Sequence, residues 1–116
     1  VNMYNGGDEP SGFTATIFAR ENVTAPVIYN AITNEALRIT GVLEKGHTLT
    51  INTSAGSKRV TITDPAGVVA NAIHRKQTSS TWLQLAAGDN YIAYAAESGA
   101  ESMLVTLRHR DLFVGV

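Results

Sequence analysis

Alternation of apolar and polar residues is clearest in Phe13-Thr14-Ala15-Thr16-Ile17-Phe18-Ala19. Successive side chains of a β-strand point to opposite faces, so the odd-numbered residues of this segment make one wholly apolar face. The other face carries Thr14, Thr16 and Phe18. The segment therefore predicts a strand with one buried face, and only Phe18 breaks the polar pattern of the opposite face.

The same period of two recurs along the chain from Gly12 onward, with clusters of Gly, Asn, Asp or Ser between the runs. The other segments expected to form strands are residues 26–29, 37–40, 47–52, 58–63, 80–85, 91–95 and 103–107. That makes about eight strands and no helix long enough for a parallel crossover. We therefore predict an all-β fold, an antiparallel two-sheet β-sandwich of the jelly-roll type, whose sheets cover each other's apolar faces.

Turn-forming residues separate the expected strands. We expect turns at Glu44-Lys45-Gly46, Asp64-Pro65-Ala66-Gly67 and Ala87-Gly88-Asp89-Asn90, and a hairpin loop at residues 54–57. The hairpin predicts that residues 47–52 and 58–63 pair antiparallel. Residues 68–76 fit a short helix by spacing and a strand by their Val and Ile content, so both alternatives stay open there.

The first residues differ in composition from the rest. The chain begins with Val1, and residues 5–12 are rich in Gly, Asp, Pro and Ser, which is typical of a linker. We therefore expect residues 1–11 to link a preceding amino-terminal domain to a sandwich formed by residues 12–116.

Composition limits the classes of partner. The chain has 116 residues, of which 44% are hydrophobic and 16% charged, and a net charge of −1 with scattered Lys and Arg, so we expect a globular domain that does not bind nucleic acid. It has no cysteine, so packing must hold the fold together. No segment approaches the roughly 20 apolar residues of a membrane span, and we expect no membrane partner.

The ionisable residues show no catalytic or metal-binding pattern. His47, His74 and His109 lie on different segments without a second ligand at zinc-site spacing. There is no Gly-x-Ser-x-Gly motif, and the acidic residues Glu44, Asp64, Asp89, Glu97 and Glu101, five of the ten in the chain, lie in or beside expected turns. We expect no catalytic site, metal or cofactor. The alternative of a hydrolase fragment requires a pocket in which carboxylates, or a nucleophile and a base, converge.

The aromatic residues are the candidates for an interaction surface. Alternation places Trp82 opposite Leu83 and Leu85, so the indole is either partly exposed for ring stacking or covered by residues 68–78. Phe18, on the polar face of its strand, is a second candidate for contact with another domain or subunit. Tyr91 and Tyr94 complete the predicted surface.

Three stretches resemble a known family, and the resemblance extends over nearly all of the chain. Residues 80–94, STWLQLAAGDNYIAY, are similar to the aromatic-x-x-Leu-x-x-Gly-x-Asn-x-Ile-x-Tyr strand–turn–strand of the carboxy-terminal domain of siphovirus-type distal tail proteins, the Dit family. Residues 37–51 and 112–116 resemble that family's turn into a hairpin and its ending. Ala87, His47 and Asn52 depart from the family, which often has proline at the first position and acidic residues at the other two.

The resemblance implies a galectin-like or carbohydrate-module-like sandwich in a structural component of a phage or prophage tail tip. It also implies that an amino-terminal domain forms a homo-oligomeric ring in the full-length protein, with this domain projecting outward to contact other tail and baseplate proteins. By itself, the present fragment is expected to be monomeric or to associate weakly. The expected location is the virion tail, after synthesis in the host cytoplasm. The alternative function is a carbohydrate-binding module for host wall polysaccharide, with Trp82 and the tyrosines as stacking surfaces.

Overall fold

The computed structural model describes residues 2–7, 11–54, 56 and 58–109. The described residues form eleven β-strands and two short 3-10 helices. The strands are β1 (Asn2–Asn5), β2 (Phe13–Ala19), β3 (Val23–Thr24), β4 (Val27–Asn30), β5 (Ala36–Arg38), β6 (Val42–Leu43), β7 (Thr48–Asn52), β8 (Arg59–Thr63), β9 (Val69–Asn71), β10 (Gly88–Ala95) and β11 (Met103–His109). The helices are η1 (Ile73–Arg75) and η2 (Ala100–Ser102).

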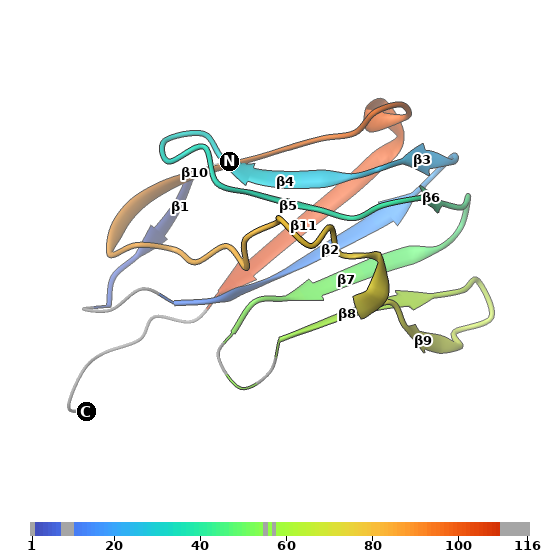
Figure 1. The fold of residues 1–116 in the computed structure, drawn as a ribbon, viewed down its shortest axis with the longest axis horizontal. Coiled ribbons are helices and arrows are strands. Elements are labelled where there is room, and N and C mark those ends of the chain that lie inside the picture. The colour runs from blue at the N-terminus through green and yellow to red at the C-terminus, as the bar shows by residue number, and fades with distance from the viewer. Residues whose placement is uncertain (1, 8–10, 55, 57, 110–116) are drawn as a thin grey trace.

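Two main sheets face each other. One has the strand order β1-β10-β4-β5 and the other β11-β2-β7-β8-β9, while β3 and β6 form a separate short pair. Neighbouring strands are antiparallel in every pairing of the described residues, and Figure 1 shows the two layers. The predicted all-β antiparallel sandwich is confirmed.

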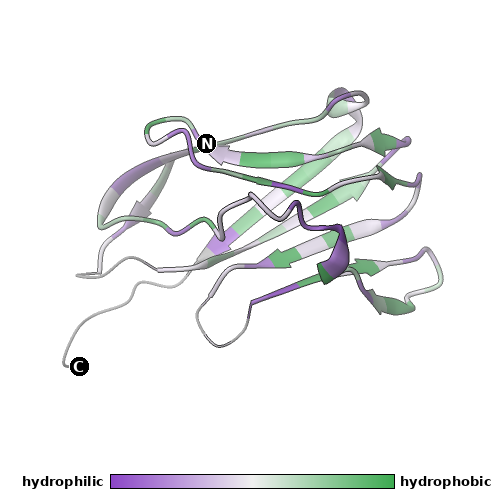
Figure 2. Ribbon diagram, in the orientation of Figure 1, coloured by the Kyte–Doolittle hydropathy of each residue, from purple (hydrophilic) through white to green (hydrophobic). Residues whose placement is uncertain are grey.

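Apolar side chains from the inner faces of both sheets make one core. β2 supplies its centre, since Phe13, Ala15, Ile17 and Ala19 are all at most 1% exposed, as the alternation predicted. Figure 2 shows the hydrophobic residues concentrated on the strands, with hydrophilic residues at strand ends, on the helix η1 and in some connections. Burying one large aliphatic side chain contributes about 1.5–3 kcal/mol, so the shared core is the main force that holds the two sheets together.

The prediction that residues 1–11 form a linker is wrong for residues 2–5. Residues 2–5 form β1, which pairs with β10 in the register Met3↔Asn90 and Asn5↔Gly88. Met3 and Asn5 are buried, and the Asn5 side-chain amide donates to the Leu85 carbonyl at 3.0 Å. Residues 2–5 therefore belong to the sandwich, because their own period of two supplies a buried face. Residues 8–10 lie outside the described part of the chain.

The segment before β10 also differs from the prediction. Residues 80–84 form no strand, and Leu85 makes only an isolated bridge with Ser11, although Leu83 and Leu85 are buried as the alternation predicted. The expected turn at residues 87–90 instead contains the start of β10. Asn90 explains the change, because its side chain accepts from the Ala86 amide at 2.9 Å and donates to the Ala86 carbonyl at 2.8 Å.

Residues 68–76 combine the two alternatives that the sequence left open. Val69–Asn71 is β9, which pairs with β8, and Ile73–Arg75 is the 3-10 helix η1. Arg75 connects η1 to the β5–β6 connection and to β6, because its Nε donates to the Thr40 carbonyl at 3.0 Å and its Nη2 to the Val42 carbonyl at 2.7 Å. In the described residues, no helix is long and apolar enough to cross a bilayer.

Candidate interaction surfaces

The four predicted aromatic residues do not form one surface. Phe18 lies on the outer face of the five-stranded sheet and is 38% exposed. Tyr91 lies on the outer face of the four-stranded sheet and is 52% exposed. Tyr94 is 41% exposed but follows the alternation of the buried residues Asn90 and Ile92, so it belongs to the opposite face of β10 from Tyr91.

Trp82 lies in the connection between η1 and β10, where its half-buried side chain packs against the core. The Lys76 ammonium lies 5.2 Å from the centroid of the indole ring and donates to the Ser80 carbonyl at 2.7 Å. A cation over an aromatic face stabilises the pair by about 0.5–1 kcal/mol at an exposed site. Lys76, from the segment expected to cover the indole, therefore occupies one face that a ligand would need for stacking.

A strip of tyrosines crosses the outer face of the four-stranded sheet. Tyr4 is opposite Asp89 and Tyr29 is opposite Ala93, so each is a diagonal neighbour of Tyr91 on an adjacent strand. Tyr4 is 62% exposed and Tyr29 half-buried. Diagonal neighbours in a sheet are about 7–8 Å apart, within reach of aromatic side chains. We call Tyr4, Tyr91 and Tyr29 the tyrosine strip.

Sequence reasoning missed two members of the tyrosine strip. Tyr4 was assigned to the linker, although tyrosine is enriched in strands and its position next to the apolar Met3 could have indicated an outward-facing strand residue. Tyr29 follows the alternation of its strand, but the strand order that places it beside β10 depends on pairing between segments far apart in the sequence.

The outer face of the five-stranded sheet is rich in threonine. Its central cross-strand row, which we call the threonine row, consists of Thr106, Thr16, Thr50, Thr61 and Asn71, each opposite the next on the neighbouring strand. The row on one side contains Leu104, Phe18, Thr48, Thr63 and Val69, and the row on the other side contains Arg108, Thr14, Asn52 and Arg59. The face thus runs from an apolar end to a basic end.

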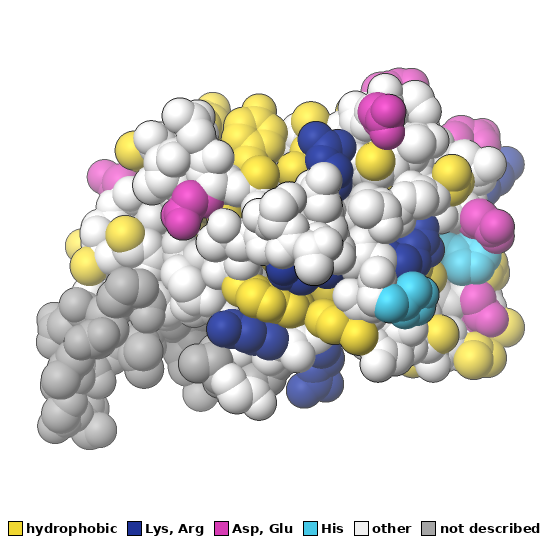
Figure 3. Space-filling view, in the orientation of Figure 1, with side chains coloured by type: hydrophobic (Ala, Val, Ile, Leu, Met, Phe, Trp, Pro, Cys, Tyr) yellow, Lys and Arg dark blue, Asp and Glu magenta, His cyan; other side chains and the backbone are white. Residues whose placement is uncertain are grey.

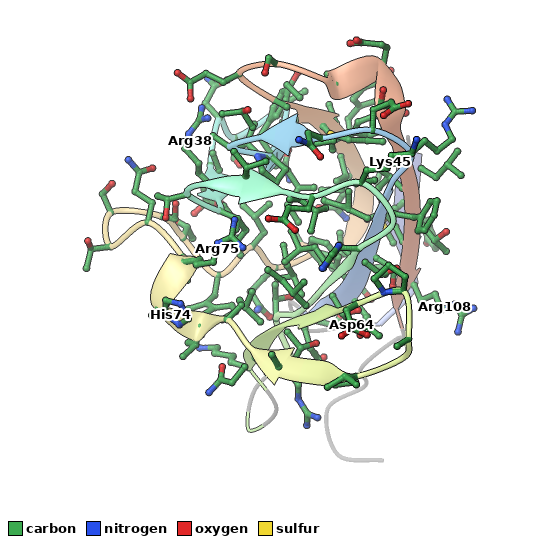
Figure 4. The ribbon with its side chains drawn as sticks, turned by 90° about the vertical axis from the view of Figure 1, so that its right-hand side faces the viewer. Arg38, Lys45, Asp64, His74, Arg75 and Arg108 are labelled. Atoms are coloured by element: carbon green, nitrogen blue, oxygen red, sulfur yellow. The ribbon has the colours of Figure 1, made fainter. Side chains whose placement is uncertain are left out.

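The ionisable residues are distributed over the surface. Figure 3 shows Lys and Arg in several separate places on the face it displays. Figure 4 shows Asp64 and His74 on different elements with their side chains apart, and Arg75 turned toward the β5–β6 connection. In the part of the chain that the structure describes, no three His, Cys, Asp or Glu side chains are grouped to hold a metal ion. The described ionisable residues named above therefore do not converge in the way that a hydrolase site requires.

The architecture of the chain defines a class of protein domain. It is an antiparallel β-sandwich domain whose most prominent candidate surfaces are the outer faces and edges of its sheets. Residues 6–112 match the family model of the siphovirus-type tail component, C-terminal domain, and the chain therefore belongs to that family. No curated protein and no solved structure matches the chain significantly. Family membership assigns a structural role to the domain as a phage tail component, which implies a location in the virion tail and contact with other tail proteins.

Proposed function

We propose that this domain is a non-enzymatic protein-interaction module of a distal tail protein at the tail tip or baseplate. The family match over residues 6–112 carries the proposal. In this scheme a preceding amino-terminal domain forms the homo-oligomeric ring, and the sandwich projects outward to contact baseplate or fibre proteins. The exposed sheet faces support a role in binding proteins, because flat rigid faces present many side chains in a fixed arrangement without needing a cleft.

The location can be tested in assembled particles. An epitope inserted after Ala66, in the exposed turn between β8 and β9, should leave the sandwich intact, because the turn lies outside both sheets. Gold-labelled antibody should then decorate virions at the distal end of the tail. Labelling along the tail tube, or virions without the epitope, would contradict the proposal.

The contact role requires a separate test. Phage carrying a deletion of the domain should either assemble tails that lack specific baseplate or fibre proteins or fail to complete the tail tip. Mass spectrometry of purified particles would identify the missing proteins. Particles of unchanged composition would show that the domain recruits no tail component.

Carbohydrate binding is the second candidate function, and the tyrosine strip is the observation that favours it. Aromatic rings in a row along an exposed sheet face suit stacking against the apolar faces of successive sugar rings. Trp82 is less suited to this role than the sequence suggested, because Lys76 lies over its ring.

Titration with host wall polysaccharide would test this function. If the tyrosine strip binds glycan, Tyr91→Ala should weaken binding at least about tenfold, the equivalent of 1.4 kcal/mol. Phe18→Ala, on the outer face of the other sheet, is the matched control and should bind as wild type does. Equal effects of the two substitutions, or no saturable binding by the wild-type chain, would exclude the strip as a glycan site.

A further inference from the structure

The edges of the two sheets are protected to different degrees. The free edge of β5 is covered by residues 77–81. The Gln77 amide donates to the Arg38 carbonyl at 2.9 Å, and the Thr81 amide donates to the Ala36 carbonyl at 3.0 Å. The edge strands β1 and β9 have only four and three residues. The remaining edge strand, β11, has seven residues and pairs with β2 alone among the described strands, as Figure 1 shows.

The backbone of β11 presents a regular set of hydrogen-bonding groups on its outer side. The Arg20 amide donates to the Ser102 carbonyl at 2.9 Å, which fixes the phase of the ladder between β2 and β11. Because antiparallel ladders alternate, the backbone groups of even-numbered β11 residues face β2. The Met103 amide is already taken, because it donates to the Ala100 carbonyl at the end of η2. The Met103 carbonyl and the backbone groups of Val105, Leu107 and His109 face away from the sheet, where no described strand receives them.

β11 has little of the usual protection of an edge strand. Natural sheets block exposed edges with charged side chains, proline, bulges or short strands. β11 contains neither lysine nor proline, and its charged residue Arg108 lies near its carboxyl end. Leu104 is 51% exposed on the outer face, and Val105 and Leu107 stay partly exposed although they pack against the core. An added strand would satisfy the outward backbone groups and cover both of the latter side chains.

We propose that β11 pairs antiparallel with β11 of a second copy of this chain, about a twofold axis at Thr106. Thr106 is the middle residue of the strand, so this register pairs β11 over nearly its full length and sets Val105 opposite the partner's Leu107. Outward backbone groups then meet outward backbone groups, as hydrogen bonding requires. The same surface is used by both copies, which is the condition for a closed dimer.

The side chains suit this register on both faces. On the outer face, the two copies of Thr106 meet and join the threonine rows of the two molecules into one. Each Arg108 lies opposite the partner's Leu104, so no like charges face each other directly, and the arginine stem can cover the exposed leucine. The proposal rests on the β11 edge alone and does not depend on the tail function proposed above.

Single cysteines test the register, because the chain contains no native cysteine. At the axis, position 106 forms a non-hydrogen-bonded pair with Cα atoms about 4.5 Å apart, within the range of a disulfide. Thr106→Cys should therefore form a covalent dimer under mild oxidation. Leu104→Cys is the matched control on the same strand, and it should cross-link only when mixed with Arg108→Cys. Failure of Thr106→Cys to cross-link, or equal cross-linking by Leu104→Cys alone, would overturn the proposal.

Charge exchange at the axis provides a second test that a folding defect cannot imitate. Thr106→Lys and Thr106→Glu should each raise the dimer dissociation constant about tenfold or more in sedimentation equilibrium. An equimolar mixture of the two variants should restore association, because opposite charges then meet. Asn71→Lys, in the threonine row but at the β9 edge, should associate as the wild type does. A wild-type chain that stays monomeric to about 1 mM, or no recovery in the mixture, would contradict the proposed dimer.

Discussion

Gly99 and Gly67 have nearly the same backbone angle but different surroundings. Their φ angles are 82° and 88°, a left-handed region that costs a residue with a side chain about 1–2 kcal/mol. A Cβ at Gly99 would overlap the Asn22 carbonyl oxygen, whereas a Cβ at Gly67 meets nothing within 4 Å. We predict that Gly67→Ala lowers the free energy of unfolding by about 1–2 kcal/mol and that Gly99→Ala lowers it by clearly more.

Chemical denaturation of the two variants measures the difference directly. Because the angular strain is the same in both, the excess loss in Gly99→Ala reports the backbone overlap near Asn22. Equal losses would show that the connection from residue 20 to 22 moves aside without cost.

The Asn90 side chain stabilises the start of β10 through hydrogen bonds that its amide group donates and accepts. The residue is 2% exposed, and its Nδ2 donates to the carbonyls of Ala86, Gly88 and Met3. Asn90→Asp removes these donors and places a charge among carbonyl oxygens, so we predict a loss of about 3 kcal/mol or more at neutral pH, measured by urea denaturation.

Asn71→Asp is the matched control. Exposed Asn71 uses its side-chain oxygen to accept from the Ile73 amide at 3.0 Å, and aspartate keeps that acceptor. The control should change stability by less than about 0.5 kcal/mol. Similar losses in both variants would mean that the Asn90 network contributes little.

At the scale of elements, the question is whether residues 2–5 behave as the strand β1 or as a linker. Met3 is 7% exposed, so Met3→Ala should cost about 2 kcal/mol or more through lost burial and an unfilled cavity. Tyr4→Ala, on the exposed side of the same strand, should cost clearly less, because the Tyr4 side chain is 62% exposed and its loss leaves no buried cavity. Thermal unfolding distinguishes the two predictions, since a linker would tolerate both substitutions equally.

The strands in the middle of the five-stranded sheet were predictable from their sequences. β2, β7 and β8 have strict alternation, and the turn at residues 64–67 forms as expected, with the Gly67 amide donating to the Asp64 carbonyl at 2.9 Å. β3 and β6 were missed because two residues are too few to show a period. Residues 80–84 alternate without forming a strand, because burial of every second side chain does not require a partner strand.

At the scale of the whole molecule, both sheets contribute to one core and should unfold together. Leu37, in β5 of the four-stranded sheet, is fully buried, so Leu37→Ala should cost about 2–5 kcal/mol. We predict that far-UV circular dichroism and the fluorescence of the single tryptophan, Trp82, report the same midpoint in the wild type and the same shifted midpoint in the variant. Two separate transitions would show that the sheets are independent units.

The sequence by itself determined the fold class and the buried face of each long strand, because alternation is a local property that one strand displays alone. It also indicated the family through the residues around the β10 turn. Only the tertiary structure decided which strands are neighbours, and therefore that Tyr4, Tyr91 and Tyr29 share a face while Tyr94 does not. It also decided that Lys76 covers Trp82 and that β11 is an edge. The physical reason is that strand order depends on contacts between segments far apart in the chain, which no local pattern records.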